Sequence, residues 1–214
     1  MRNNEFGVLF DLDGVLIDSE RSYTEFWAGI ERDYPTGIPD YPLAIKGTTL
    51  SQIIAHYPEG EIRDAIVARI HEFEKVIRYG LCDGVAEFLD SLQAAGVPMA
   101  IVTSSDDVKM KELFVQLPGL RNYFGAVVDG TMVSRSKPDP EGYCLGAAKL
   151  GLDPKQCYVF EDSLQGLQAG MASGATVIGV ASTFPSSKLQ NHAHAIIDSF
   201  RGFTLTDLLA VSRP

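Results

Sequence analysis

The stretch from Phe6 to Val15 places two aspartates directly after a short apolar run, and it constrains the fold more than any other part of the chain. Residues 6–10 are apolar apart from one glycine and show no helical spacing, which is typical of a strand buried on both faces of a parallel sheet. Asp11 and Asp13 are two residues apart, so on an extended chain their side chains leave the same face. Two adjacent carboxylates repel each other unless a cation or a shared proton intervenes. The stretch therefore predicts a chemical site at the end of a strand.

Aspartates at such a position can also have a purely structural role. A single aspartate after a strand often starts a turn or caps the next helix, and for either residue alone this alternative stays open. A calcium-binding loop also opens with Asp-x-Asp, but Val15, Leu16 and Ser22 stand where that loop needs a ligand, a glycine and a glutamate. The sequence contains neither a phosphate loop ending in Gly-Lys-Ser/Thr nor a GxGxxG motif, so ATPase and dinucleotide-binding functions have no support.

Length, charge and cysteine content further limit the domain organisation and the partners that the chain can have. A chain of 214 residues is long enough for one main domain and an insertion. The net charge of −10 and the lack of a Lys/Arg-rich run argue against a nucleic-acid partner. Cys82, Cys144 and Cys157 have no CxxC spacing, which favours reduced thiols. No leader-like segment or membrane-spanning apolar stretch is recognisable, so we expect a cytoplasmic protein without a membrane partner, either a monomer or a weak homodimer.

After Asp18 the pattern becomes helical. Apolar residues recur at helical spacing from Tyr23 to Tyr34, with Ser19 as the expected cap, and a stretch rich in Pro and Gly over 35–42 ends that helix. Further helices are predicted over 50–54 and 62–77. Residues 19–80 are thus expected to form a small helical unit without strands.

From Asp83 onward, predicted strands and helices alternate, beginning with a helix that Asp83 should cap and that ends near Gly96. This alternation predicts an α/β fold with a doubly wound, Rossmann-like parallel sheet formed by residues 1–18 and 81–214. Ligands of such sheets bind beyond the carboxyl ends of the strands. The predicted strands after the first are 99–103, 126–128, 157–160, 176–180 and an edge strand at 196–197, separated by helices around 108–114, from Pro140 to Gly151, and up to Gly174.

Four short motifs follow one another at the predicted strand ends and resemble those of the haloacid dehalogenase superfamily. They are Asp11-Leu12-Asp13-Gly14, Thr103, Ser136-Lys137-Pro138-Asp139-Pro140 and Glu161-Asp162-Ser163. The resemblance covers essentially the whole chain, and the helical unit 19–80 is similar to the cap domain of that superfamily. The subgroup that it resembles most holds β-phosphoglucomutase and small sugar-phosphate phosphatases.

The resemblance implies a Mg²⁺ cofactor held by Asp11, Asp162 and the backbone carbonyl of Asp13, with Glu161 binding directly or through water. It implies that Asp11 attacks the phosphorus of a small phosphorylated metabolite and forms an aspartyl-phosphate. Asp13 then protonates the leaving oxygen, so it must be neutral when substrate arrives, and later takes a proton from water.

Three further residues complete this implied machinery, and several of the motif residues have a structural alternative. Thr103 and the Ser104 amide would hold the phosphoryl oxygens, and Lys137 would offset the negative charge. Thr103 could instead bond to backbone at a strand end, and Lys137 could be a solvated loop lysine. Glu161 and Asp162 could be an acidic pair at a helix N-terminus.

In the superfamily that the chain resembles, the dehalogenases have no acid at the position of Asp13, and phosphonoacetaldehyde hydrolase has alanine there. The resemblance therefore implies that Asp13 favours transfer to or from an oxygen atom, hence a phosphatase or a phosphomutase. The phosphomutases of the family carry a cap histidine where this chain has Tyr23, and an arginine where it has Leu50. We therefore expect a Mg²⁺-dependent phosphatase, with a β-phosphoglucomutase-type mutase as the alternative and a non-catalytic phospholigand-binding regulator as a third. The expected substrate contacts from the cap are Tyr23, Lys46, Gly47 and Thr49.

Overall fold

The computed structural model describes residues 6–213 around a six-stranded sheet with the order β3-β2-β1-β4-β5-β6. All neighbouring strands are parallel, so the predicted doubly wound α/β fold is confirmed. The order reverses between β1 and β4, and Asp11 follows β1 at this switch point. The strands are β1 (Gly7–Phe10), β2 (Met99–Val102), β3 (Ala126–Val128), β4 (Cys157–Glu161), β5 (Thr176–Val180) and the predicted edge strand β6 (Ala195–Ile197).

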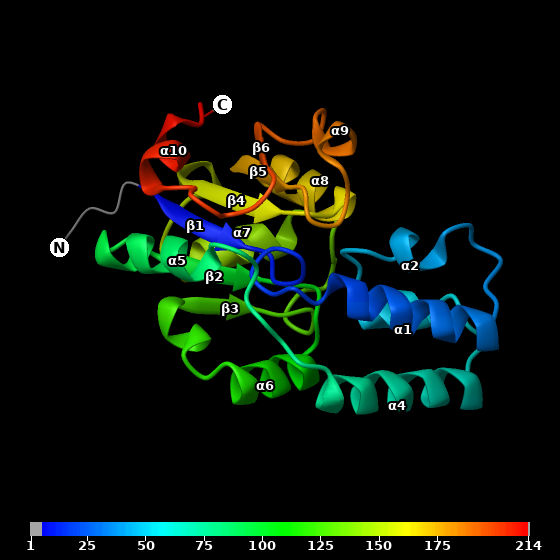
Figure 1. The fold of residues 1–214 in the computed structure, drawn as a ribbon. Helices are drawn as coiled ribbons and strands as arrows, with labels where there is room; N and C mark the ends of the chain where they lie inside the picture. The colour runs from blue at the N-terminus through cyan, green and yellow to red at the C-terminus, as the bar shows by residue number, and fades with distance from the viewer. Residues whose placement is uncertain (1–5, 214) are drawn as a thin grey trace.

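Helices cover both faces of the sheet (Figure 1). All four residues of β1 are buried, because its side chains point alternately to the two covered faces. Leu9 of β1 belongs to the apolar cluster under α7 and α8, whereas its neighbours Val8 and Phe10 belong to the cluster under α5 and α10. Phe10 stacks on Phe160 with a centroid distance of 5.2 Å, and Phe88 and Phe200 complete this aromatic group. The helices of these layers are α5 (Val85–Ala94), α6 (Asp107–Gln116), α7 (Glu141–Lys149), α8 (Leu164–Ser173), α9 (Ser186–Leu189) and α10 (Leu205–Ala210), with short 3-10 turns at Leu120–Tyr123 and Pro154–Gln156.

Residues 20–76 form four helices that lie beyond the carboxyl ends of the strands (Figure 1). They are α1 (Glu20–Asp33), α2 (Tyr41–Ala44), α3 (Leu50–Ile54) and α4 (Glu61–Val76). Three of them match the predicted helices. The short α2 was not predicted, because it begins inside the stretch rich in Pro and Gly and carries a proline in its first turn. The ends of the predicted core segments, residues 1–5 and 214, lie outside the described residues.

Of two predicted helix caps, Asp83 was wrong, and Ser19 is the N-cap of α1 but does not use its side chain to cap the helix. Helix α5 begins after Gly84, whose φ of 82° favours glycine, and the Asp83 side chain pairs instead with Arg201 at 2.7 Å. Ser19 does precede α1, but its hydroxyl makes no capping hydrogen bond. It donates to Asp13 instead, because the chain between these residues folds back on itself.

Two glycines of α8 allow close packing, for different reasons. A Cβ atom on Gly170 would lie 3.0 Å from Val177 and 3.2 Å from Val159, so this glycine brings the helix close to the sheet. A Cβ atom on Gly166 would lie 1.7 Å from the carboxylate of Glu161. Gly166 therefore makes room for the side chain of Glu161 at the end of β4.

Among residues 6–213, no helix combines the length and the apolar character that crossing a membrane requires. The thiols of Cys82, Cys144 and Cys157 are free, which agrees with the sequence prediction.

We expect Gly166→Ala to lower the free energy of unfolding by about 1–3 kcal/mol, because the added methyl group overlaps the buried Glu161 carboxylate. The matched control is Gly29→Ala in α1, where the nearest atom to the added Cβ is a guanidinium nitrogen of Arg32 at 3.7 Å. That change should raise the free energy of unfolding by about 0.5–1 kcal/mol through helix propensity. Urea denaturation measures the free energy of unfolding of both variants. Equal changes in Gly166→Ala and Gly29→Ala would contradict the steric cause.

Candidate active site

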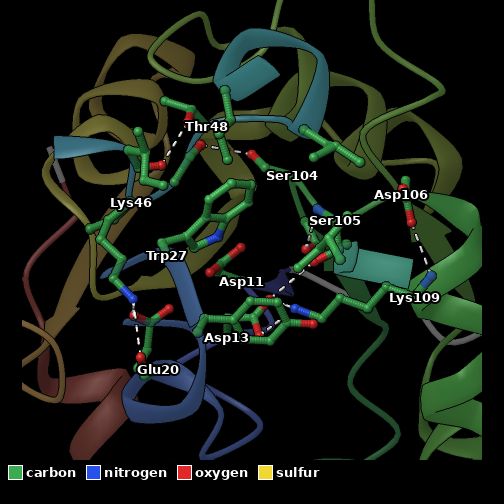
Figure 2. A pocket seen from close by; sticks show the side chains of 18 of the residues that line it. Asp11, Asp13, Glu20, Trp27, Lys46, Thr48, Ser104, Ser105, Asp106 and Lys109 are labelled. Carbon is green, nitrogen blue, oxygen red and sulfur yellow. Dashed lines mark hydrogen bonds and ion pairs between the residues drawn. The ribbon is translucent and has the colours of Figure 1, made fainter. Parts of the chain in front are cut away.

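A cavity of about 110 Å³ lies between the carboxyl ends of the strands and the helices of residues 20–76. Asp11 and Asp13 lie at its base, with Trp27 and Lys46 on the side of the helices (Figure 2). A cavity at the switch point of a doubly wound sheet is the expected ligand site of this fold.

Asp11 is held by Lys137 in a buried ion pair. The Lys137 ammonium lies 2.6 Å from Asp11 Oδ1 and 2.5 Å from Glu161 Oε1, and it donates to the Val102 carbonyl at 3.3 Å. Burial raises the pKa of Asp11 to about 7, with Lys137 opposing this shift and Glu161 adding to it. The two carboxylates in turn raise the pKa of Lys137 despite its burial, so it stays charged. The predicted approach of Lys137 to Asp11 is thus present, and Lys137 is not a solvated loop residue.

Every lone-pair direction of Glu161 has a donor. Its Oε1 accepts from Lys137 and from the Tyr143 hydroxyl at 3.0 Å, and its Oε2 accepts from the amides of Asp162 and Ser163 at 2.9 Å. The side chain is fully buried. Glu161 therefore fixes Lys137 and the start of α8 in place, and its carboxylate is less available as a direct metal ligand than those of Asp11 and Asp162.

Asp11, Glu161 and Asp162 bring carboxylate oxygens within 4.8 Å of one another. Burial and the nearby carboxylates of Glu20, Glu161 and Asp11 raise the pKa of Asp162 well above its usual range. An all-oxygen donor set with excess negative charge fits a hard divalent cation, which would relieve this repulsion. Asp162 also accepts a hydrogen bond from the Thr183 hydroxyl, which orients it.

Asp13 has a different partner from Asp11. The Lys109 ammonium lies 2.6 Å from Asp13 Oδ1 and 2.5 Å from Oδ2, and the hydroxyls of Ser19 and Ser105 donate to the same carboxylate. Burial alone would raise the pKa of Asp13, but Lys109 and these donors lower it below its usual range. In this arrangement Lys109 therefore favours the ionised form of Asp13, whereas the expected role of Asp13 as an acid requires the neutral form when substrate arrives.

The predicted phosphate-binding residues lie at the end of β2. The Thr103 hydroxyl accepts from the Ser105 amide at 3.0 Å, and Ser104 donates from its hydroxyl to the Gly47 carbonyl at 2.8 Å. Both residues line the cavity next to Asp11 and Asp13. The hydroxyl of Thr103 thus has the backbone bond foreseen as its alternative, and this bond orients the loop that borders the cavity.

Three of the four residues predicted on the helical segment line the cavity. Tyr23 bonds through its hydroxyl to Glu74 and Tyr79, both at 3.2 Å. Lys46 pairs with Glu20, and Gly47 approaches Ser163 so closely that a Cβ atom would lie 2.5 Å from its hydroxyl.

Thr49, the fourth, does not line this cavity. It is the N-cap of α3, where its amide donates to the Gln52 side chain at 3.1 Å and its hydroxyl contacts Ser51. Thr49 also lines a smaller neighbouring pocket together with Thr103, Ser104 and Lys137, so its predicted substrate contact stays a prediction.

Sequence reasoning missed Lys109, Glu20 and Trp27. Lys109 lies in the first turn of α6, directly after the loop that carries Thr103, and is buried. Position in the first turn after a predicted strand-end motif is the one signal that could have marked it. Glu20 and Trp27 both belong to α1 and line the cavity (Figure 2).

Known proteins share this sequence pattern and this fold. The family profile described as haloacid dehalogenase-like hydrolase matches residues 7–174. The chain belongs to the haloacid dehalogenase-like hydrolases. Hexitol phosphatase A of Escherichia coli is 31% identical over 207 residues, which cover 94% of each chain.

Solved structures of the family have the same architecture. A hydrolase of family IA, variant 3, from Entamoeba histolytica has a TM-score of 0.82 at 24% sequence identity. The alignment covers 96% of this chain and 98% of the Entamoeba histolytica chain. β-Phosphoglucomutase of Clostridium difficile has a TM-score of 0.79 at 18% identity, with 95% of both chains covered. The resemblance to this superfamily, and to the subgroup with the sugar-phosphate phosphatases and β-phosphoglucomutases, is therefore confirmed.

We expect Lys109→Met to raise the pKa of Asp13 above its ordinary value, because burial then acts on the carboxyl without an ammonium partner. Loss of this buried pair should also lower the free energy of unfolding by at least about 2 kcal/mol. Titration of the aspartate carboxyl carbons by NMR in EDTA measures the first effect and urea denaturation the second. Lys111→Met, on the same helix but in an exposed pair with Asp107, is the control and should change neither quantity. An unshifted Asp13 in Lys109→Met would contradict the assignment.

Proposed function

We propose that this protein is a Mg²⁺-dependent phosphatase that hydrolyses a small phosphate monoester, a sugar or polyol phosphate, through an aspartyl-phosphate on Asp11. The observation that carries the proposal is the position of Asp11 beside Asp13 at the switch point of the sheet, with Lys137 bonded to Asp11 at 2.6 Å. Pure binding does not need a nucleophile next to an acid, which argues against a non-catalytic regulator.

In the first half of the proposed reaction, a carboxylate oxygen of Asp11 attacks phosphorus. A bond forms between this oxygen and phosphorus, and the bond from phosphorus to the leaving alcohol oxygen breaks. Asp13 gives its proton to that oxygen. Lys137 stays beside Asp11 and offsets the charge that gathers there. Thr103 and the Ser104 amide are proposed to bind the phosphoryl oxygens.

In the second half, Asp13 takes a proton from water, and the water oxygen attacks the phosphorus of the aspartyl-phosphate. The bond to Asp11 breaks, and phosphate leaves. Asp13 must be protonated in the first half, so Lys109 has to release it when substrate binds. Substrate phosphate, a dianion, is a competing partner for the Lys109 ammonium.

The oxygen donors of Asp11 and Asp162, the Asp13 carbonyl and Glu161, directly or through water, are proposed to hold Mg²⁺. When bound, the cation supplies charge neutralisation for the phosphate and orientation of its oxygens.

The proposed substrate class rests on the relative named hexitol phosphatase A and on the cavity. The helical segment 19–80 is proposed to be the cap, with residues 1–18 and 81–214 as the core domain. Its Tyr23, Lys46 and Gly47 would contact the substrate from that side. Two groups that serve the family's phosphomutases are replaced by Tyr23 and Leu50, and the Tyr23 hydroxyl is already engaged by Glu74 and Tyr79. The phosphatase is therefore preferred to the mutase.

We expect the protein to release phosphate from a hexitol 6-phosphate, and EDTA should abolish this activity until Mg²⁺ is restored in excess. Asp11→Asn should lower kcat by more than about 1000-fold, because it removes the proposed nucleophile. Asp107→Asn, on the exposed side of α6, is the matched control and should leave kcat unchanged. Phosphate release is measured colorimetrically.

Two outcomes would overturn the proposal. Isomerisation of β-glucose 1-phosphate that a hexose bisphosphate stimulates, with little phosphate release, would indicate the mutase. Turnover that survives in Asp11→Asn would remove the aspartyl-phosphate mechanism.

A further inference from the structure

Helix α4 contributes a buried carboxylate oxygen without a hydrogen-bond partner to the cavity wall. Within residues 6–213, the buried side-chain polar atoms that lack a partner are Tyr57 Oη, Glu74 Oε2 and Thr176 Oγ1. Of these residues, Glu74 alone lines the cavity. Its side chain is only 4% exposed, and its other oxygen accepts from the Tyr23 hydroxyl at 3.2 Å. A buried carboxylate oxygen left unpaired is destabilising, so it points to a donor that arrives with a ligand.

On the basis of the proposed function, we propose that Glu74 selects the substrate by accepting a hydrogen bond from a hydroxyl group of its alcohol part. The substrate would then be a polyol or sugar phosphate that carries a free hydroxyl at some distance from the phosphate. Glu74 is a specificity residue in this proposal and takes no part in bond breaking.

The position of Glu74 relative to Asp13 supports this role. The Lys109 ammonium lies 2.5 Å from Asp13 and 4.0 Å from the centroid of the Tyr23 ring. The Tyr23 hydroxyl in turn bonds to Glu74. Glu74 therefore follows Asp13 along one wall of the cavity, on the side of the group that protonates the leaving oxygen. The alcohol part of the substrate departs on this side.

The rest of the wall from the helical segment suits the carbon skeleton of such a substrate. Its apolar part consists of Trp27 and aliphatic side chains, beside the polar Glu20, Lys46 and Thr48, and in Figure 2 the Trp27 indole lies above Asp11 and Asp13. An indole face packs well against the C–H groups of a sugar or polyol. A substrate whose carbon chain packs on Trp27 and whose hydroxyl donates to Glu74 would contact the apolar part of the wall and pair the free carboxylate oxygen. The aliphatic residues of this wall are Pro42, Ile45, Leu50, Ile53 and Ile70.

Charge around Glu74 favours a neutral donor. Burial raises the pKa of Glu74 to about 7, with Lys109 opposing the shift and Asp106 adding to it. A hydroxyl donor would stabilise the ionised form without bringing another charge into the wall.

The surroundings of Glu74 suit a metal ion less well than they suit a hydroxyl group. His71, Glu74 and Asp106 do offer ligand atoms within 4.8 Å of one another. However, Asp106 already caps α6 through the Lys109 amide at 3.0 Å and faces His71 at 3.4 Å. The adjacent Lys109 ammonium also repels a divalent cation.

The test compares Glu74→Gln with the wild type on a hexitol 6-phosphate and on phenyl phosphate, which has no hydroxyl. Glutamine keeps one oxygen for Tyr23 but turns an NH₂ donor toward the cavity. We expect kcat/KM for the hexitol phosphate to fall about 10- to 100-fold more than kcat/KM for phenyl phosphate, mainly through KM. Glu72→Gln, on the same helix in an exposed pair with Lys75, is the matched control and should show no such difference.

A binding measurement keeps this inference separate from the proposed function. In an Asp11→Asn background with constant Mg²⁺, calorimetry compares the Kd of the hexitol phosphate with and without Glu74→Gln, beside the Kd of inorganic phosphate. Selective weakening of the hexitol phosphate supports the role of Glu74 even if the wild type shows no turnover. Equal losses for both ligands, or no loss, would overturn it. If His71→Ala weakened binding of the hexitol phosphate as much as Glu74→Gln does, and if this effect depended on metal concentration, His71, Glu74 and Asp106 would be a metal site. That result would also overturn the proposed role of Glu74.

Discussion

The buried contact of Lys137 with Asp11 and Glu161 is the interaction on which the rest of the site depends. It joins the ends of three neighbouring strands, because Asp11 follows β1, Glu161 ends β4, and the same ammonium donates to Val102 at the end of β2. Buried charges are tolerated only when their remaining hydrogen-bond capacity is satisfied. The buried hydroxyl of Tyr143 and the amides at the start of α8 provide this for Glu161, and Gly166 leaves room for it. The packing of α8 against the sheet and the arrangement of the charged site residues therefore depend on the same contacts of Glu161.

The two aspartates of the first motif are adjacent, yet their environments separate them. Burial and Glu161 raise the pKa of Asp11, whereas Lys109 lowers the pKa of Asp13. The proposed reaction needs the opposite order, an ionised nucleophile and a protonated acid. A cation bound at Asp11 would lower the pKa of Asp11, and substrate phosphate would draw Lys109 away from Asp13. The proposed chemistry therefore requires both the cation and the substrate before the two carboxyl groups have the protonation states that the reaction needs.

Local patterns were sufficient for the sheet and for the motif residues at the strand ends. Strand alternation and a strand-end Asp-x-Asp are read from a few adjacent residues, and the resemblance supplied Lys137 and Asp162. For Lys109 the local pattern gives only its position after a strand-end motif, and a lysine in a helix is ordinarily solvated. Its burial depends on Tyr23 and on α4, which are far away in sequence. Asp83 failed as a cap for a similar reason, since the chain also places Arg201 within reach of it.

The contacts between the helical segment and the core show how selection and reaction can be joined. Few hydrogen bonds connect them in the described residues of the cavity rim, such as Ser104 to the Gly47 carbonyl at 2.8 Å and Gln165 to the Ala44 carbonyl at 3.3 Å. Each neutral bond of this kind contributes about 1 kcal/mol. The packing of α4 against α6 and the apolar cluster shared by Trp27, Ile70 and Phe10 also hold the segment on the core. Trp27 and Glu74 belong to the segment, while Asp11 and Asp13 belong to the core. Under the proposed function, a substrate that satisfies Glu74 gains binding energy from the segment while its phosphate lies at Asp11 and Asp13 of the core. A substrate without that hydroxyl would still reach Asp11, but it would lose this part of the binding energy.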